Sequence, residues 1–273
     1  MNSIRAGGFN ILPPVVKNLL IINGLFYLAT VLLSAKGIDL VSIFGLHYFG
    51  ATAFRPWQII TYMFMHGSFG HIFFNMFALW MFGSAIENAL GSRRFLAYYL
   101  ITGIGAAIIH YIIIYFQIHP MLALLNGFIE HPSLETFRLL AENNTSYRFH
   151  EMLTNNLLFL QHNPDKLMEL VQVTAIAKET FLNSFVIIGA SGSVFGLLLA
   201  FGMMFPNSEI YIYFLLPIKA KWFVIIYGAI ELIYGVTGSA DGVAHFAHLG
   251  GMLFGFLLLL LWNRYDKKQR RQF

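Results

Sequence analysis

Residues 245–262 read HFAHLGGMLFGFLLLLLW, an apolar run that indicates the class of fold. As an α-helix it would extend about 27 Å, close to the ~30 Å thickness of the hydrocarbon core of a bilayer. Five basic residues crowd the last ten positions of the chain: Arg264, Lys267, Lys268, Arg270 and Arg271. Such a tail could bind nucleic acid, but a basic cluster directly after an apolar helix is more typical of a cytoplasmic membrane end. We therefore predict a membrane helix and no nucleic-acid partner.

The composition of the whole chain also points to a lipid environment. Hydrophobic residues make up 58% of the 273 residues and charged residues only 11%, against about 25% charged in a soluble domain. Apolar runs long enough to cross a bilayer recur near 15–35, 69–90, 95–117, 185–205, 215–236 and 245–262. The first run could be a signal peptide, but no small-residue cleavage site follows it, which favours a retained anchor. The sequence predicts an all-α membrane protein, a six-transmembrane-helix bundle in one membrane domain over 1–273.

The basic residues also predict how the chain crosses the membrane, because cytoplasmic loops are enriched in lysine and arginine. One side of a six-span chain receives Arg5 and Lys17, Arg93 and Arg94, Lys219 and Lys221, and the basic tail over 263–273. We therefore expect a multi-pass protein of the plasma membrane with both termini in the cytoplasm. Residues 118–184 then form an extracytoplasmic insertion, in which apolar residues at helical spacing predict short helices on the outer membrane surface.

Polar side chains inside apolar spans are expensive in hydrocarbon, so each is a candidate functional residue. Ser191 lies in Gly189-Ala190-Ser191-Gly192 at the start of the fourth span. Gly189 and Gly192 would leave room for a substrate backbone, and the positive end of the helix favours an oxyanion nearby. The structural alternative is that these small residues only allow close helix packing.

The sixth span is expected to bring a base to the depth of this serine. A serine hydroxyl becomes a good nucleophile only when a neighbouring base takes its proton, and imidazole is the usual base near neutral pH. His248 lies at the expected depth of Ser191, and His245, one turn away, could be the base instead. Gly251 and Gly255, four residues apart on one helix face, would let spans four and six pack closely enough for a hydrogen bond.

The second span contributes two further polar side chains at a similar depth. His71 and Asn75 are four residues apart and therefore share one helix face. A pair of neutral donors facing the serine would suit the stabilisation of a tetrahedral oxyanion. We expect Glu87, near the cytoplasmic end, to serve as a helix cap or salt-bridge partner. We interpret Glu231 and His110 as isolated polar groups that pack or face water.

Metal chemistry fits the sequence less well. His71, His245 and His248 could ligate zinc as a three-histidine site, but no carboxylate base is apparent beside them. The pair His150-Glu151 begins like a zinc-protease motif, but Thr154 stands where its second histidine is needed. The absence of cysteine excludes disulfides, thiolate metal sites and a cysteine nucleophile. We therefore predict no metal and no cofactor.

Four stretches carry a resemblance to a known family: residues 66–75 (HGSFGHIFFN), 87–92 (ENALGS), 189–192 (GASG) and 247–251 (AHLGG). In this order and on these spans, they resemble the motifs of the rhomboid intramembrane serine proteases. The resemblance implies a six-helix core that cleaves other transmembrane proteins within the lipid bilayer. It further implies that the cleavage uses a serine–histidine dyad without a third acid.

The resemblance also assigns roles by position. It makes Ser191 the nucleophile and His248 the general base and acid. His71, Asn75 and the backbone N–H of Ser191 would stabilise the oxyanion, and the imidazole of His248 would stack on Phe195. The chain departs from the family in two places. Trp57 in the first outer loop is followed by Gln58 where the family usually has arginine, and the insertion over 118–184 is longer than the family core needs.

Two other classes of function compete with proteolysis. A rhomboid-like fold could bind membrane proteins or assist their quality control without cutting them, but a pure binder needs no nucleophile and base at one depth. A transporter would also place polar groups in glycine-rich spans. The sequence shows no internal repeat and no paired intramembrane carboxylates, which argues against transport.

Overall fold

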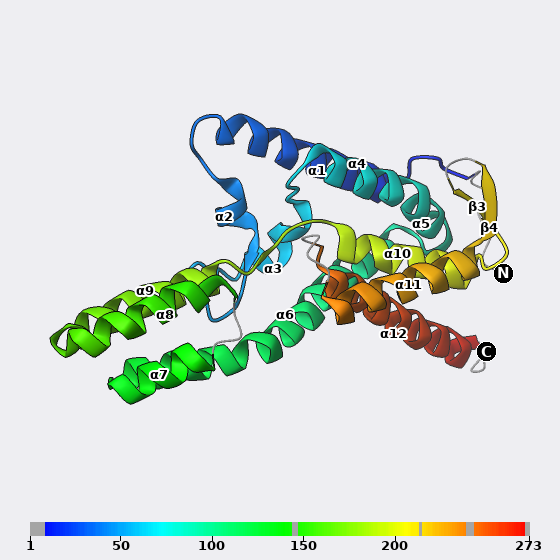
Figure 1. Ribbon diagram of the computed structural model, residues 1–273. Coiled ribbons are helices and arrows are strands. Elements are labelled where there is room, and N and C mark those ends of the chain that lie inside the picture. The colour runs from blue at the N-terminus through cyan, green and yellow to red at the C-terminus, as the bar shows by residue number, and fades with distance from the viewer. Residues whose placement is uncertain (1–8, 144–146, 213–214, 239–242, 271–273) are drawn as a thin grey trace. The chain divides into compact units, whose positions relative to one another are not determined.

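A computed structural model describes residues 9–143, 147–212, 215–238 and 243–270 (Figure 1). Arg5 and the last three residues of the predicted cytoplasmic tail lie outside these ranges. The chain divides into two compact units. The first takes in Met1–Leu46, Arg55–His110 and Ile187–Phe273, and the second takes in His47–Phe54 and Tyr111–Val186.

Long apolar helices dominate the chain. Within the described ranges, five helical stretches are long and apolar enough to cross a membrane: Pro14–Ser34, Phe69–Leu90, Ser92–Glu130, Ala220–Thr237 and His245–Lys267. They correspond to α1 (Pro14–Ser34), α4 (Phe69–Ala78) with η2 (Leu79–Gly83) and α5 (Ser84–Leu90), α6 (Ser92–Glu130), α11 (Ala220–Thr237) and α12 (His245–Arg270). A sixth apolar helix, α10 (Ser191–Met204), is shorter. The predicted class, an all-α membrane bundle, is confirmed.

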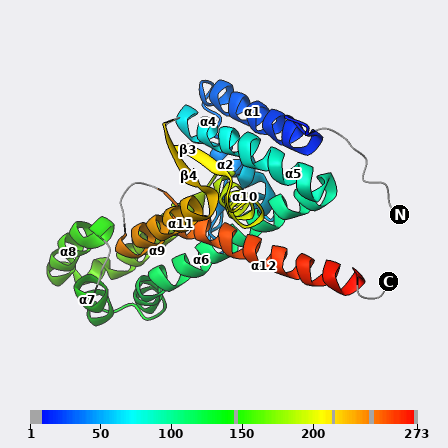
Figure 2. The same ribbon diagram turned by 90° about the vertical axis from the view of Figure 1, so that its right-hand side faces the viewer.

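Helix α10 forms the centre of the first unit, as Figure 2 shows by viewing it nearly end-on. Nine of its 14 residues are buried. Its apolar side chains join a cluster with residues of α1, η2, α5, α6 and α11: Val16, Leu19, Leu79, Phe82, Ile86, Phe95, Tyr98, Tyr99, Val194, Leu197, Leu198 and Val224. A helix that is apolar on all sides is expected in such a central position, because each of its faces packs against a neighbour.

The contact between α10 and α12 is a backbone contact. A Cβ atom added at Gly251 would lie 1.9 Å from the carbonyl oxygen of Gly192, far inside van der Waals distance. Only glycine permits this approach, which agrees with the expected use of Gly251 in close packing. The start of α12 is therefore held directly against the start of α10.

A buried carboxylate fastens the start of α1. Glu87, in α5, accepts hydrogen bonds from the backbone N–H groups of Val15 and Val16 at 3.1 and 2.8 Å. The Ser92 hydroxyl donates to the same side chain at 2.6 Å. The first N–H groups of a helix have no partner within the helix, and a carboxylate is a suitable acceptor for them. Glu87 thus caps a neighbouring helix, in line with the cap that the sequence suggests.

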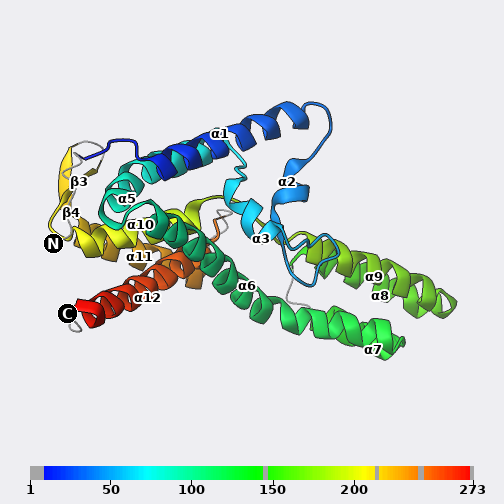
Figure 3. The same ribbon diagram turned by 180° about the vertical axis from the view of Figure 1, so that it is seen from behind.

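Three predicted span boundaries are wrong. The fourth span starts at Ser191 rather than 185, because strand β2 (Val186–Ile187) precedes α10. The third span does not end near 117, because α6 continues without interruption to Glu130 (Figure 3). Pro120 lies inside it, and one proline removes a single backbone donor without ending the helix. The fifth span starts at Ala220 rather than 215, because β3 (Glu209–Ile212) and β4 (Leu216–Lys219) pair as an antiparallel hairpin before it. Pro217 disfavours helical geometry at the residue before it, which explains the later start.

Shorter elements complete the first unit. They are α2 (Leu40–Phe44), α3 (Gln58–Thr61) and the 3-10 turn η1 (Tyr62–Phe64). The two-residue strands β1 (Leu46–His47) and β2 (Val186–Ile187) lie where the chain passes from one unit to the other.

The second unit is helical and has a core of its own. It holds the end of α6, then α7 (Leu134–Glu142), α8 (Tyr147–His162), the turn η3 (Pro164–Lys166) and α9 (Leu167–Asn183). Phe128 of α6 meets Phe137 of α7 edge to face, with ring centroids 4.9 Å apart. Ser133 opens α7 with a capping box. Helices are therefore present in the predicted insertion, although its first apolar residues belong to α6 rather than to a separate helix.

Candidate active site at the start of α10

The site is built on the turn that leads into α10. Gly189 has a φ of +119°, a region that residues with a side chain rarely adopt. Its N–H donates to the carbonyl of Tyr62 at 2.9 Å. A Cβ atom at this position would lie 2.6 Å from Nε2 of His71 and 3.8 Å from Nδ2 of Asn75. The turn therefore requires glycine, and both side chains of α4 face it.

Ser191 and His248 meet across the contact between α10 and α12. Ser191 is the first residue of α10 and is partly exposed, whereas His248 lies in the first turn of α12 and is buried. The Ser191 hydroxyl lies 2.9 Å from Nε2 of His248, within hydrogen-bond distance. The imidazole of His248 stacks flat on the ring of Phe195, with centroids 4.0 Å apart and an interplanar angle of 6°. Stacking limits ring rotation and keeps Nε2 directed at the serine.

His71 and Asn75 approach the same turn from α4. Ser68 caps α4 by accepting a hydrogen bond from the N–H of His71 at 3.1 Å. The His66 ring packs edge-on against His71 at 4.9 Å. Burial lowers the pKa of His66 to about 4, so this neighbour is neutral at physiological pH. Asn75 is buried, and its Nδ2 has no hydrogen-bond partner among the residues that the structure describes.

A carboxylate that the sequence treats as isolated lies behind His248. Oε2 of Glu231, in α11, is 2.9 Å from Nδ1 of His248 and 2.7 Å from Nδ1 of His245. All three side chains are buried. Interpreting Glu231 as an isolated polar group is therefore wrong. Because α11 and α12 are consecutive membrane helices, the end of one and the start of the other share a depth, and this signal could have linked Glu231 to the histidines.

The metal-ligand set suggested by the sequence is not the one that the structure gathers. Among the described residues, the potential ligand atoms that come together are those of Glu231, His245 and His248, within 4.8 Å of one another. His71 is not part of this group. The separations of 2.7 and 2.9 Å are hydrogen-bond distances, and the remaining nitrogen of His248 faces Ser191.

Gln58, at the position where the resemblance to rhomboids leads one to expect arginine, holds the loop before α3 in place. The side chain is fully buried. Its Oε1 accepts from the N–H of Arg55 at 3.0 Å, and its Nε2 donates to the carbonyl of Ile43 at 3.2 Å. The indole N–H of Trp57 points to the same carbonyl at 3.3 Å. Glutamine has both a donor and an acceptor, so it can bridge two backbone segments.

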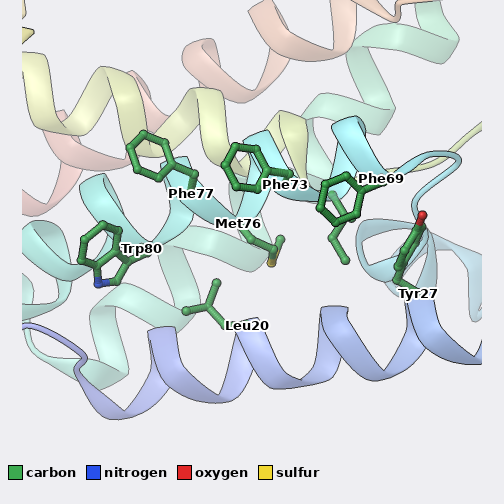
Figure 4. A pocket seen from close by; sticks show the side chains of 8 residues that line it. Leu20, Tyr27, Phe69, Phe73, Met76, Phe77 and Trp80 are labelled. Atoms are coloured by element: carbon green, nitrogen blue, oxygen red, sulfur yellow. The ribbon is translucent and has the colours of Figure 1, made fainter. Parts of the chain in front are cut away.

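An apolar groove lies on the opposite face of α4. Its volume is about 430 Å³, and Figure 4 shows its lining side chains, which come from α1 and from the helix that starts with α4: Leu20, Tyr27, Phe69, Ile72, Phe73, Met76, Phe77 and Trp80. Phe69 and Phe73 lie about half a helical turn around α4 from His71. The groove is therefore separate from the serine site.

The family of the chain follows from a comparison with known proteins. Residues 53–119 and 156–265, more than half of the chain, match the Rhomboid domain. The chain belongs to the rhomboid family. The match covers α4, α10 and most of α12, which supply Ser191, His248, His71 and Asn75.

Individual rhomboid relatives are similar over different lengths. An uncharacterized mitochondrial rhomboid protein of Schizosaccharomyces pombe is 24% identical over 217 residues, 77% of this chain and 52% of that protein. The rhomboid protease GluP of Bacillus subtilis is 39% identical over 56 residues, 20% of this chain and 11% of that protein. The rhomboid protease GlpG of Salmonella newport is 39% identical over 59 residues, 22% of this chain and 20% of that protein. This rhomboid thus spans about half the length of the fission-yeast relative and less of the other two.

Proposed function

We propose that this rhomboid is an intramembrane serine protease that cleaves single-span membrane proteins near their outer membrane end. The observation that carries the proposal is the 2.9 Å contact between Ser191 Oγ and His248 Nε2, with the imidazole stacked on Phe195. A nucleophile and a base within hydrogen-bond reach, with the base held by a third group, are what acyl transfer requires. The family membership and the relatives named as proteases support the same activity.

The reaction would run in two halves. Ser191 Oγ attacks the carbonyl carbon of the scissile peptide bond while its proton passes to His248 Nε2. The tetrahedral intermediate collapses, the proton moves from His248 to the leaving amine, and an acyl ester remains on Ser191. Water then attacks the ester, giving its proton to His248, and the returning proton restores the serine as the new carboxyl product leaves.

The oxyanion of each intermediate would be stabilised by donors around Gly189. His71 Nε2 and Asn75 Nδ2 face this turn, and the first backbone N–H groups of α10, including that of Ser191, have no partner within their helix. A buried donor without a partner is unfavourable in the resting protein. The unpaired Nδ2 of Asn75 would therefore gain a partner only when the oxyanion forms, which favours the transition state.

Charge distribution supports the proposed orientation in a plasma membrane, with both termini in the cytoplasm. Arg94 at the start of α6 forms two hydrogen bonds of 2.8 Å with Asp266 near the end of α12, so these helix ends lie at one level. Both carry basic clusters, as cytoplasmic ends do. The helices that carry Ser191, His248 and His71 near their starts run toward the side of the basic clusters. This direction would put the site near the outer surface. The catalytic water would then enter from outside.

A fluorophosphonate probe tests this proposal directly, because it reacts with activated serines. We expect labelling of the detergent-solubilised wild type and none of Ser191→Ala. His248→Ala should also lose labelling, since the hydroxyl then has no base. Wild-type labelling in either variant would refute the assignment. An unlabelled but folded wild type, beside a labelled active rhomboid protease, would favour the non-catalytic binding function instead.

A further inference from the structure

The carboxylate of Glu231 stands in line with the proposed serine and histidine. Ser191 Oγ lies 2.9 Å from one nitrogen of His248, and Glu231 Oε2 lies 2.9 Å from the other. The three groups come from α10, α12 and α11. We propose that Glu231 is a positioning residue that completes a Ser–His–Glu triad. This inference rests on the proposed protease function and adds an acid to the dyad that the resemblance implies.

The first consequence concerns the tautomer of His248. A carboxylate oxygen only accepts hydrogen bonds, so Nδ1 of His248 carries the ring proton and donates it to Glu231. Nε2 then presents a lone pair to the Ser191 hydroxyl, as a general base must. Without the carboxylate, the neutral ring could place its proton on Nε2, where it cannot accept from the serine. Phe195 fixes the plane of the ring but has no influence on where the proton lies.

The second consequence concerns charge during the reaction. His248 becomes an imidazolium when it takes the serine proton, and a charged ring in a buried, largely apolar site is unfavourable alone. The carboxylate of Glu231, 6% exposed, lies in contact with that charge as it forms. Among the described residues, the other titratable groups near this pair are His245 of α12, His71 of α4, His110 of α6 and Tyr227 of α11. Glu231 is the one among them that supplies an anion.

The second donor to Glu231 explains how the carboxylate keeps its position. His245 Nδ1 donates to Oε2 at 2.7 Å, and the His245 ring lies 5.5 Å from that of Tyr234. A buried carboxylate needs at least one such partner in the resting enzyme. His245 is therefore placed to orient Glu231, rather than to act as the base on Ser191.

A purely structural carboxylate has different partners in the same unit. Glu87 is 3% exposed and accepts from the backbone N–H groups of Val15 and Val16. The proton donors to Glu231 are instead two imidazoles, one of which touches Ser191. Glu87→Gln is thus a matched control for Glu231→Gln, because both substitutions remove a buried negative charge and keep the side-chain size.

The test measures how fast the fluorophosphonate probe inactivates each variant, separating the maximal rate kinact from the half-saturating concentration KI. We expect Glu231→Gln to lower kinact about 10² to 10⁴-fold with KI little changed, the range for losing a triad acid. Glu231→Asp retains the charge and should recover part of the rate. Glu87→Gln should reduce thermal stability without lowering kinact comparably.

Several outcomes would overturn the triad while leaving the protease standing. These are a wild-type kinact in Glu231→Gln, an equal loss in Glu87→Gln, or no advantage of Glu231→Asp over Glu231→Gln. If Glu231→Gln does not fold, ¹⁵N spectra of histidine in the wild type decide, with His248→Ala identifying the signal. A proton on Nδ1 of His248 supports the triad, and one on Nε2 overturns it. Labelling that persists in Ser191→Ala would instead remove the protease proposal itself.

Discussion

Among single residues, Asn75 is a buried amide in the candidate site whose donor nitrogen is left for a substrate to satisfy. Asn23 of α1 and Asn75 of α4 are both buried amides, but Asn23 Nδ2 donates to the carbonyl of Leu19 at 2.7 Å. Asn75 Nδ2 has no partner among the described residues. A donor kept unpaired in this way lowers stability and is retained where a function uses it.

Asn75→Ala should therefore separate activity from stability. We expect a loss of about 10² to 10³ in kcat, the scale for one oxyanion donor. The melting temperature should not fall by as much as in Asn23→Ala, because Asn75→Ala removes an amide that makes no hydrogen bond through Nδ2. Cleavage rates and thermal melts of both variants provide the measurement. Equal losses of activity in the two variants would contradict the role of Asn75.

At the scale of elements, the position of His248 relative to Ser191 depends on how closely α10 and α12 approach. The backbone of Gly192 fills the space where a side chain of residue 251 would begin. Interiors packed at this density do not absorb extra atoms without moving the backbone. The 2.9 Å hydrogen bond between Ser191 and His248 therefore depends on the close contact of two glycines as well as on the two reacting residues.

Gly251→Val should force the two helices apart. We expect probe labelling to disappear and the free energy of unfolding to fall by about 1–3 kcal/mol or more, the range for overpacking a core. Gly24→Ala is the matched control, because a Cβ at Gly24 in α1 meets no atom within 4 Å. It should leave labelling intact and stability equal or higher, since alanine favours a helix over glycine. Retained labelling in Gly251→Val would contradict the close-packing argument.

At the scale of the whole molecule, every residue of the candidate site belongs to the first unit. The second unit has its own buried core, including Phe128 and Phe137. Because the described site residues lie in the first unit, we expect the serine and histidine to assemble without residues 118–184, and we expect the second unit to shape which substrates enter.

Replacing residues 118–184 with a short flexible linker tests this division. We expect Ser191 to remain reactive with the fluorophosphonate probe, because all groups around it are retained. The choice among single-span substrates should change, measured as relative kcat/KM for a panel of transmembrane peptides in liposomes. Full cleavage with unchanged substrate choice would show that the second unit has no part in substrate entry.

Comparison with the sequence-based expectations shows which features local chemistry reveals. The length of the apolar runs predicts the membrane helices. The small residues at fixed spacing predict that Gly251 packs closely against the fourth span. The sequence does not predict that α6 continues to Glu130, because its one internal proline leaves the end of the helix undecided. It does not predict the hairpin before α11 either, because the short polar segment there favours neither helix nor strand. The structure decides such cases through the neighbours each segment meets.

The amino-acid sequence alone shows that this chain is an apolar helical bundle of the rhomboid family, because the spacing of apolar residues, the length of apolar runs and the motifs are local properties of the chain. The contacts of Glu231 with His245 and His248, and the bond from Gln58 to the carbonyl of Ile43, follow from the tertiary structure alone. A polar residue in a membrane span must find a partner, but the partner lies on another helix. Its identity depends on helix rotation and depth, which are set by packing between helices.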